Sequence, residues 1–190
     1  MTKPFSAPDG LPAKSEPEDL SSSAGLLVSI LVRYPEVASV KLAPRDGLIR
    51  LTFMLHRETD KAEADAFAES LGANLEAFHT LLGQHDLYLG VESAKHGDYT
   101  ALDVYRDVGS LSREEISLIS QLVAKSFDGE LIEEAGEPIA KEDQEFQEDM
   151  IDALLDDLRV GSGERDLIGY REEGRVFVFN KGDGAARQRA

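Results

Sequence analysis

Two spacings of apolar residues alternate along the chain. In some stretches apolar residues recur every three or four positions, which places them on one face of a helix, and in others they recur every second position, which places them on one face of a strand. In chain order these spacings predict a helix, a strand pair, a helix, a strand pair, two helices and a final strand pair. The expected helices cover about residues 21–34, 61–82, 113–127 and 142–159, and the expected strand pairs cover about 37–55, 87–104 and 167–180.

Turn and cap residues delimit these elements and repeat with a similar spacing. Gly47 and Gly97 lie in the turns of the first two strand pairs, 50 residues apart. Asp60 and Ser112 each precede a glutamate by three residues, which is the spacing of a capping box at the start of a helix, and they lie 52 residues apart. We infer a duplicated unit of two strands and a helix. Two ordinary, unrelated hairpins are the alternative that the sequence leaves open.

The predicted fold class is α+β. Two units of two strands and a helix can merge into an antiparallel four-stranded sheet with helices over one face, which is a circular permutation of the ferredoxin-like arrangement. The other face carries polar residues such as Arg50, Thr52, Asp103 and Tyr105, and it is left free for a partner. The last strand, 176–179, is apolar on both faces, so we expect both of its faces to be covered.

Composition divides the chain into four segments. Residues 1–19 are rich in proline and lack an apolar run, which predicts a disordered leader and not a secretory signal. Residues 20–133 form the expected sheet domain, and residues 134–180 add an acidic amphipathic helix and a β-hairpin as an appendage. Residues 181–190 are expected to be a disordered tail. No apolar run is long enough to predict a transmembrane helix.

Charge is distributed unevenly over the chain. The 190 residues carry 37 acidic and 20 basic groups, a formal net charge of -17. Residues 128–157 alone hold 13 acidic residues and one basic residue, a net charge of -12, whereas residues 158–190 have seven basic and five acidic residues. Nucleic acids and anionic membranes are polyanions, so the charge argues against both as direct partners. The charge outside residues 128–157 sums to only -5, so the sheet domain itself is not excluded from binding an anion.

The acidic helix over 142–159 is amphipathic and is the most distinctive feature of the sequence. Its apolar face can dock in a groove of a partner while its carboxylates steer a basic surface. The alternative is that the apolar face packs on the same chain. Carboxylates spread along a helix cannot wrap one ion, so no metal site is expected there. The expected partner-binding residues are Phe146, Met150, Leu154 and Leu158 on the apolar face, and Glu145, Asp149, Asp152 and Asp156 on the acidic face.

Catalytic motifs are missing from the sequence. It contains no cysteine, no G-x-S-x-G nucleophile motif and no phosphate-binding loop. The lack of cysteine excludes disulfides and thiolate metal sites. Neither a cofactor nor a metal is expected. The weak catalytic candidates, which form an active site only if the fold brings them into one cleft, are His56, His79, His85 and Asp103.

These observations favour a small acidic cytoplasmic interaction or regulatory protein without enzymatic activity. Its C-terminal helix and hairpin are expected to contact a protein partner with a basic or apolar groove, and a homo-oligomer is left open. One alternative is an enzyme or a small-ligand-binding domain that uses a cleft lined by histidine and aspartate. Another is an acidic mimic of nucleic acid that occupies a basic groove, whose binding would weaken steeply with salt.

Overall fold

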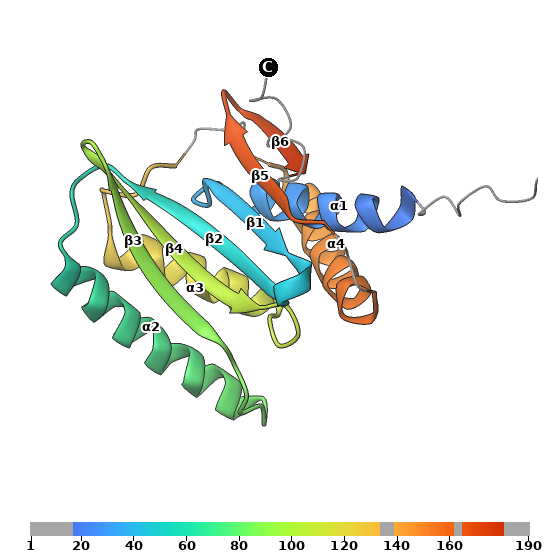
Figure 1. The fold of residues 1–190 in the computed structure, drawn as a ribbon, viewed down its shortest axis with the longest axis horizontal. Coiled ribbons are helices and arrows are strands. Elements are labelled where there is room, and N and C mark those ends of the chain that lie inside the picture. The colour runs from blue at the N-terminus through green and yellow to red at the C-terminus, as the bar shows by residue number, and fades with distance from the viewer. Residues whose placement is uncertain (1–16, 134–138, 162–164, 181–190) are drawn as a thin grey trace, which may run out of the picture.

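The computed structural model describes residues 17–133, 139–161 and 165–180. Over these residues the protein has an α+β fold with one antiparallel sheet of six strands and four helices (Figure 1). The helices are α1 Pro17–Arg33, α2 Lys61–Leu81, α3 Arg113–Ser126 and α4 Lys141–Val160. The strands are β1 Ser39–Ala43, β2 Leu48–Leu55, β3 Leu89–His96, β4 Tyr99–Asp107, β5 Leu167–Glu172 and β6 Arg175–Asn180.

The sheet is larger than the four-stranded sheet expected from the sequence, and that expectation is wrong. Its strand order is β3-β4-β2-β1-β5-β6, so the C-terminal hairpin extends the sheet by pairing β5 with β1. The physical reason is the inward face of β5: Leu167 is buried in the core, and Gly169 lies directly against α1. A hairpin with such a face is more stable when it joins the existing sheet, because an isolated two-stranded hairpin is only marginally stable in water.

The first two hairpins meet in the middle of the sheet through their second strands. Strand β2 pairs with β4 in antiparallel register from Leu48 opposite Asp107 to Leu55 opposite Thr100. Each of these two strands is followed by a helix, α2 after β2 and α3 after β4. The arrangement is the one that two related units would form about a two-fold axis. The duplication and the permuted ferredoxin-like arrangement both stay predictions.

The four helices of the described residues all lie on one face of the sheet, as Figure 1 shows. The cross-strand row Val104, Leu51, Val40 and Gly169 lies on this face, and the first three are fully buried. Helix α1 packs on β1, β5 and β6, α2 packs on β3, and α3 lies between α2 and α4. The residues between these positions in each strand point to the opposite face, which we call the open face.

Local signals at the starts of helices and at the turns are confirmed. Asp60 accepts a hydrogen bond from the Glu63 amide at 2.8 Å and caps α2, and the Ser112 side chain caps α3 in the same way. Gly47 and Gly97 have φ values of 65° and 63°, a region that glycine enters at little cost, and both lie in hairpin turns. The sequence therefore predicts the element boundaries well where side chains act locally.

Helix α4 packs along α1 on the helix-covered side of the sheet. The side chain of Leu154 lies only 3.3 Å from where a Cβ on Gly25 would stand, so the two helices approach closely. Arg113 of α3 pairs with Glu148 and Asp152 of α4 at 3.1 and 3.0 Å. The helix is therefore attached to its own chain by both apolar and ionic contacts. The predicted division into a domain over 20–133 and an appendage over 134–180 implies that the first segment folds without the second. That division stays a prediction.

Candidate functional site

The open face of the sheet has two chemically different halves. Its polar half lies on β2, β3 and β4, and there the side chains bind one another. Asp103 accepts a hydrogen bond of 2.6 Å from the Thr52 hydroxyl and pairs with Arg50 at 3.5 Å. The Tyr105 hydroxyl donates to Glu92 at 3.0 Å. These side chains therefore bind neighbours on adjacent strands, as is usual for polar side chains on a sheet surface, although Nε of Arg50 is buried without a hydrogen-bond partner.

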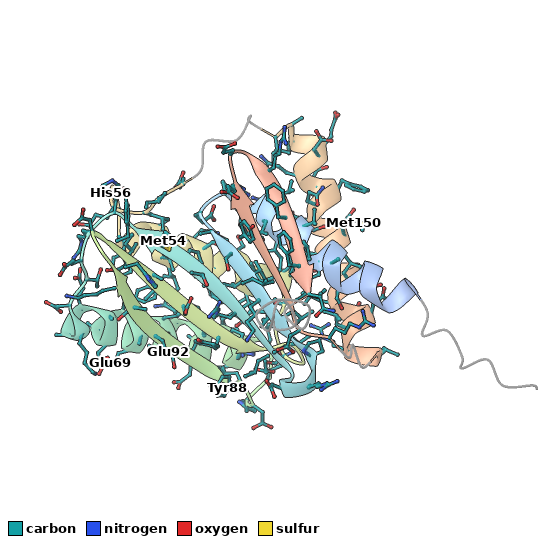
Figure 2. The ribbon with its side chains drawn as sticks, turned by 45° about the horizontal axis from the view of Figure 1, so that its top comes forward. Met54, His56, Glu69, Tyr88, Glu92 and Met150 are labelled. Carbon is teal, nitrogen blue, oxygen red and sulfur yellow. The ribbon has the colours of Figure 1, made fainter. Side chains whose placement is uncertain are left out.

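The other half of the open face is aromatic. We call Tyr170 of β5 with Phe177 and Phe179 of β6 the aromatic trio. The ring of Tyr170 lies 5.8 Å from each phenylalanine ring, and the two phenylalanine rings are 6.4 Å apart, all in stacked orientation. Phe179 is 49% exposed, and the other two rings are half-buried. Figure 2 shows the open face with its side chains, with Met54 and Glu92 labelled on the same sheet.

The aromatic trio overturns one expectation from the sequence. The last strand was expected to be covered on both faces, because both of its faces are apolar. Val176 and Val178 do pack partly against the core on the helix side. Among the described residues, however, no element covers Phe177 and Phe179 on the open side. A cluster of partly exposed aromatic rings is unusual for a sheet face that only contacts water.

The two outer edges of the sheet also differ. The edge strand β3 carries Glu92 and Lys95, Lys95 pairs with Glu58 at 2.9 Å, and α2 packs beside the strand. Charged side chains and a covering helix are common means of protecting an edge from further pairing. The edge strand β6 has the sequence RVFVFN, in which Arg175 is the one charged residue. The aromatic trio therefore lies next to the less protected edge.

The predicted partner-binding residues on α4 are split by the structure. Leu154 is only 8% exposed, and Met150 and Leu158 pack partly against the core. Most of the apolar stripe therefore contacts the same chain. Phe146, near the start of the helix, is 60% exposed. Figure 2 labels Met150 on α4, which packs along α1. Of the predicted acidic residues, Asp152 pairs with Arg113 and Asp156 with Arg159, Glu145 lies 3.9 Å from Lys141, and Asp149 is exposed.

The weak catalytic candidates are not brought together. His56 lies just after β2 and contacts the Tyr99 ring at 5.1 Å, and His85 is exposed in the segment between α2 and β3. His79 is buried on the helix side, whereas Asp103 lies on the open face. Three surface pockets in the described part of the chain have volumes of about 190, 190 and 500 Å³, and none of the four candidates lines them.

A buried charged cluster was missed by the sequence reasoning. The Arg106 side chain is fully buried between α2 and α3 and donates to Glu115, with Nη2 at 3.1 Å from Oε2. The same Glu115 oxygen lies 2.8 Å from Nε2 of His79. A signal was present: strand alternation puts Arg106 on the same side as Leu102 and Val104, where a charge needs a buried partner. The cluster ties β4 to two helices, and its burial argues for a structural role.

Asp107 lies at the edge of this cluster and has a strongly perturbed pKa. Burial alone would raise the pKa of its carboxyl group. Hydrogen bonds from Ser110 and from the Tyr88 amide, together with the charge of Arg106, outweigh burial and hold the pKa well below its ordinary range. The carboxylate therefore stabilises the fold at neutral pH.

Acidification is expected to remove this contribution. Because the folded pKa is lowered, the stabilisation is present above the ordinary aspartate pKa and is lost as the pH falls towards the folded pKa. Asp107→Asn should therefore have a lower free energy of unfolding in urea than the wild type at neutral pH. The difference in free energy of unfolding between the two proteins should become smaller below about pH 4. Asp98→Asn, in the exposed β3–β4 turn, is the control. If the free energy of unfolding of Asp107→Asn differs from that of the wild type by the same amount at every pH, the lowered pKa of Asp107 does not contribute to stability as described.

Two further findings limit the candidate sites. Within residues 17–133, 139–161 and 165–180, no group of three or more histidine, aspartate or glutamate side chains is placed so that it could hold a metal ion. In the same part of the chain, none of the helices combines the length and the apolar character needed to cross a bilayer. The candidate site that the geometry leaves is the aromatic half of the open face. Comparisons with models of protein families, with curated proteins and with solved structures found no match.

Proposed function

We propose that this protein is a non-enzymatic interaction protein that binds a protein partner through the open face of its β5–β6 hairpin. The observation that carries the proposal is the aromatic trio of Tyr170, Phe177 and Phe179, which is stacked, partly exposed and adjacent to a sheet edge. Fully burying an exposed phenylalanine side chain contributes about 1.5–3 kcal/mol, and a partner that covers the exposed part of these three rings gains a fraction of that energy from each. Interfaces are enriched in aromatic residues for this reason.

The polar half of the open face supports binding in preference to catalysis. A catalytic acid, base or nucleophile must be able to reach a substrate, whereas Asp103, Thr52 and Arg50 bind one another. The histidine of the buried cluster, His79, is 1% exposed and is held by Glu115. An enzyme that uses histidine and aspartate in one cleft remains the second hypothesis, but these positions give it no shared cleft.

The location of the acidic groups favours the hairpin over α4 as the main contact surface. Helix α4 carries eight acidic and two basic residues, and its most buried face already contacts α1. The hairpin from Leu167 to Asn180 carries two basic residues, Arg171 and Arg175, and two acidic residues, Glu172 and Glu173. It is close to neutral, so the hairpin itself adds little local repulsion or attraction to the contact with a partner.

Two matched substitutions test which surface binds. Phe179→Lys places a charge in the aromatic trio, and Phe146→Lys makes the same change at a phenylalanine on α4 that is somewhat more exposed, at 60% against 49%. We expect full-length chain used as bait to lose its specific partners with Phe179→Lys and to keep them with Phe146→Lys. Deleting the C-terminal segment is a poorer test, because it would also uncover the core side of α1 and β1.

The opposite pattern would overturn the proposal. Loss of partners with Phe146→Lys alone would assign binding to the acidic helix that the sequence first indicated. If both variants still capture the same partners, neither the hairpin nor the exposed end of α4 is the contact surface. Circular dichroism and urea unfolding of both variants establish that the fold is retained, which is expected because neither side chain is buried.

A further inference from the structure

The ring of His79 lies in the last turn of α2, is 1% exposed and has an oxygen atom next to each of its nitrogens. Nδ1 lies 3.0 Å from Oε1 of Gln84, and Nε2 lies 2.8 Å from Oε2 of Glu115. A neutral imidazole carries one N–H and can donate to only one of these oxygens, whereas an imidazolium donates to both. Both hydrogen bonds can therefore form together only when the ring carries two protons.

We infer that His79 is an imidazolium in the folded protein, and that its second proton makes a pH-sensitive clasp for the connection between α2 and β3. The clasp consists of the His79 ring with Gln84 on one side and Glu115 on the other. The connection that it holds covers residues 82–88. This inference goes beyond the proposed function, because the clasp does not include the β5–β6 hairpin.

The buried charges around the ring favour the imidazolium. Arg106 of β4 contacts two carboxylates, those of Glu115 and Asp107, so one guanidinium and two carboxylates leave a net charge of -1 without the ring. The lowered pKa of Asp107 keeps its carboxylate charged at neutral pH. A positive ring balances this group of charges, and Nη2 of Arg106, at 3.4 Å from Nε2 of His79, is the one like charge that opposes it.

Two features outside the buried cluster agree with a charged ring. His79 lies at the C-terminal end of α2, where the helix dipole favours a cation. The titratable side chains close to it along the chain, Glu76, His85 and Asp86, are all exposed to water. Their charges are therefore screened, and the balance at the ring depends on the buried groups.

The connection between α2 and β3 is held mainly at its two ends. Near its start, the Gln84 amide donates to the His79 carbonyl at 2.9 Å, and the Gln84 side chain contacts the ring. At its end, Tyr88 donates from its amide to Asp107 at 2.9 Å, and its carbonyl accepts from Arg106. Residues 81–86 are exposed, so the connection buries little apolar surface of its own. A segment with few buried contacts opens more easily than the core.

Raising the pH should open this segment. Loss of the proton on Nδ1 removes the donor to Gln84, whereas Nε2 keeps its proton and its contact with Glu115. A histidine that water reaches is mostly neutral above about pH 7. The closed clasp therefore binds a proton that the opened segment releases, so the clasp is complete at low pH and is weakened as the pH rises.

The test is NMR spectroscopy of the full-length chain labelled with nitrogen-15, from about pH 5 to pH 9. At neutral pH we expect both ring nitrogens of His79 to give the signals of protonated nitrogens. Amide hydrogen exchange, corrected for the intrinsic effect of pH, should show a several-fold loss of protection over residues 82–88 as the pH rises. Amides of β2, in the middle of the sheet, should keep their protection over the same range.

Substitutions of Gln84 test the direction of the hydrogen bond. Gln84→Glu places a carboxylate beside Nδ1, which can only accept, so the loss of protection should shift to higher pH. Gln84→Ala removes the acceptor, so the loss should shift to lower pH. Gln84 is exposed, and both variants should retain the fold. His85→Gln, at the neighbouring exposed histidine, is the control and should behave as the wild type.

Two results would overturn the inference. The first is a His79 ring with one unprotonated nitrogen at neutral pH, because Gln84 would then donate to the ring through its amide nitrogen. In that case Gln84→Glu would open the connection at neutral pH. The second is protection of residues 82–88 that stays the same at every pH, or that changes in His85→Gln as much as in the Gln84 variants.

Discussion

Replacing Glu115 with alanine is expected to lower the free energy of unfolding by about 3–5 kcal/mol, the largest loss among the changes considered. The carboxylate is fully buried and holds the guanidinium of Arg106, which is fully buried as well. Removing it leaves a positive charge without its main partner in a region that water does not reach. His79 would lose its partner on Nε2 in the same step. Urea unfolding at neutral pH measures the effect.

Two further variants separate the buried pair from ordinary surface charge. Glu114→Ala removes the neighbouring glutamate, whose side chain is 56% exposed, and should change stability by no more than about 0.5 kcal/mol. The double variant Arg106→Met with Glu115→Leu removes both fully buried charges and should be less destabilised than Glu115→Ala, because no fully buried charge is left without a partner. Asp107 loses Arg106 in this variant but keeps its hydrogen bonds from the Tyr88 and Ser110 amides. If Glu115→Ala unfolds at the same urea concentration as the wild type, the buried ion pair between Arg106 and Glu115 does not contribute to stability as described.

Gly169→Ala is expected to destabilise the protein by about 1–3 kcal/mol through overpacking. A Cβ at this position would stand 3.0 Å from Cδ1 of Leu31 and 3.2 Å from Cβ of Leu27, both on α1. The Leu31 methyl group can turn away, but Cβ of Leu27 is fixed by the helix backbone. Relief therefore requires α1 and β5 to separate, which would loosen the strand that connects the hairpin to the sheet.

Gly72→Ala is the matched control, with the opposite expected sign. This glycine lies inside α2, and its added Cβ would meet only Cδ2 of Leu89 at an ordinary 3.8 Å. Replacing a helix-interior glycine with alanine stabilises a helix by about 1 kcal/mol. Thermal or urea unfolding of the two variants should therefore move in opposite directions from the wild type. Stabilisation by both changes would contradict the close approach of α1 to β5.

The elements of this fold could be predicted from the sequence because local chemistry sets them. Alternating apolar residues marked the hairpins, and the capping residues Asp60 and Ser112 marked the starts of two helices. The joining of the third hairpin to the sheet could not be read in this way. It depends on the close fit of Gly169 against α1, and a glycine in a strand can equally mark a bulge or a bend.

The candidate site was predictable only in part. The sequence indicated an open sheet face and assigned the contact surface to the C-terminal helix and hairpin. It could not show that α4 would turn most of its apolar stripe to α1, because an amphipathic pattern does not name what it packs against. The apolar residues on both faces of β6 likewise predicted that both faces would be covered by other elements, whereas Phe179 is half exposed.

Oxidative footprinting of phenylalanine side chains tests the central claim most directly. Hydroxyl radicals label exposed rings, so the labelling rate of each phenylalanine can be compared between the dilute purified chain and the assembly isolated under native conditions. We predict that the rates of Phe177 and Phe179 fall several-fold in the assembly, while the rate of Phe146 stays the same. Protection of Phe146 with unchanged labelling of Phe177 and Phe179 would contradict the account and move the contact surface to α4.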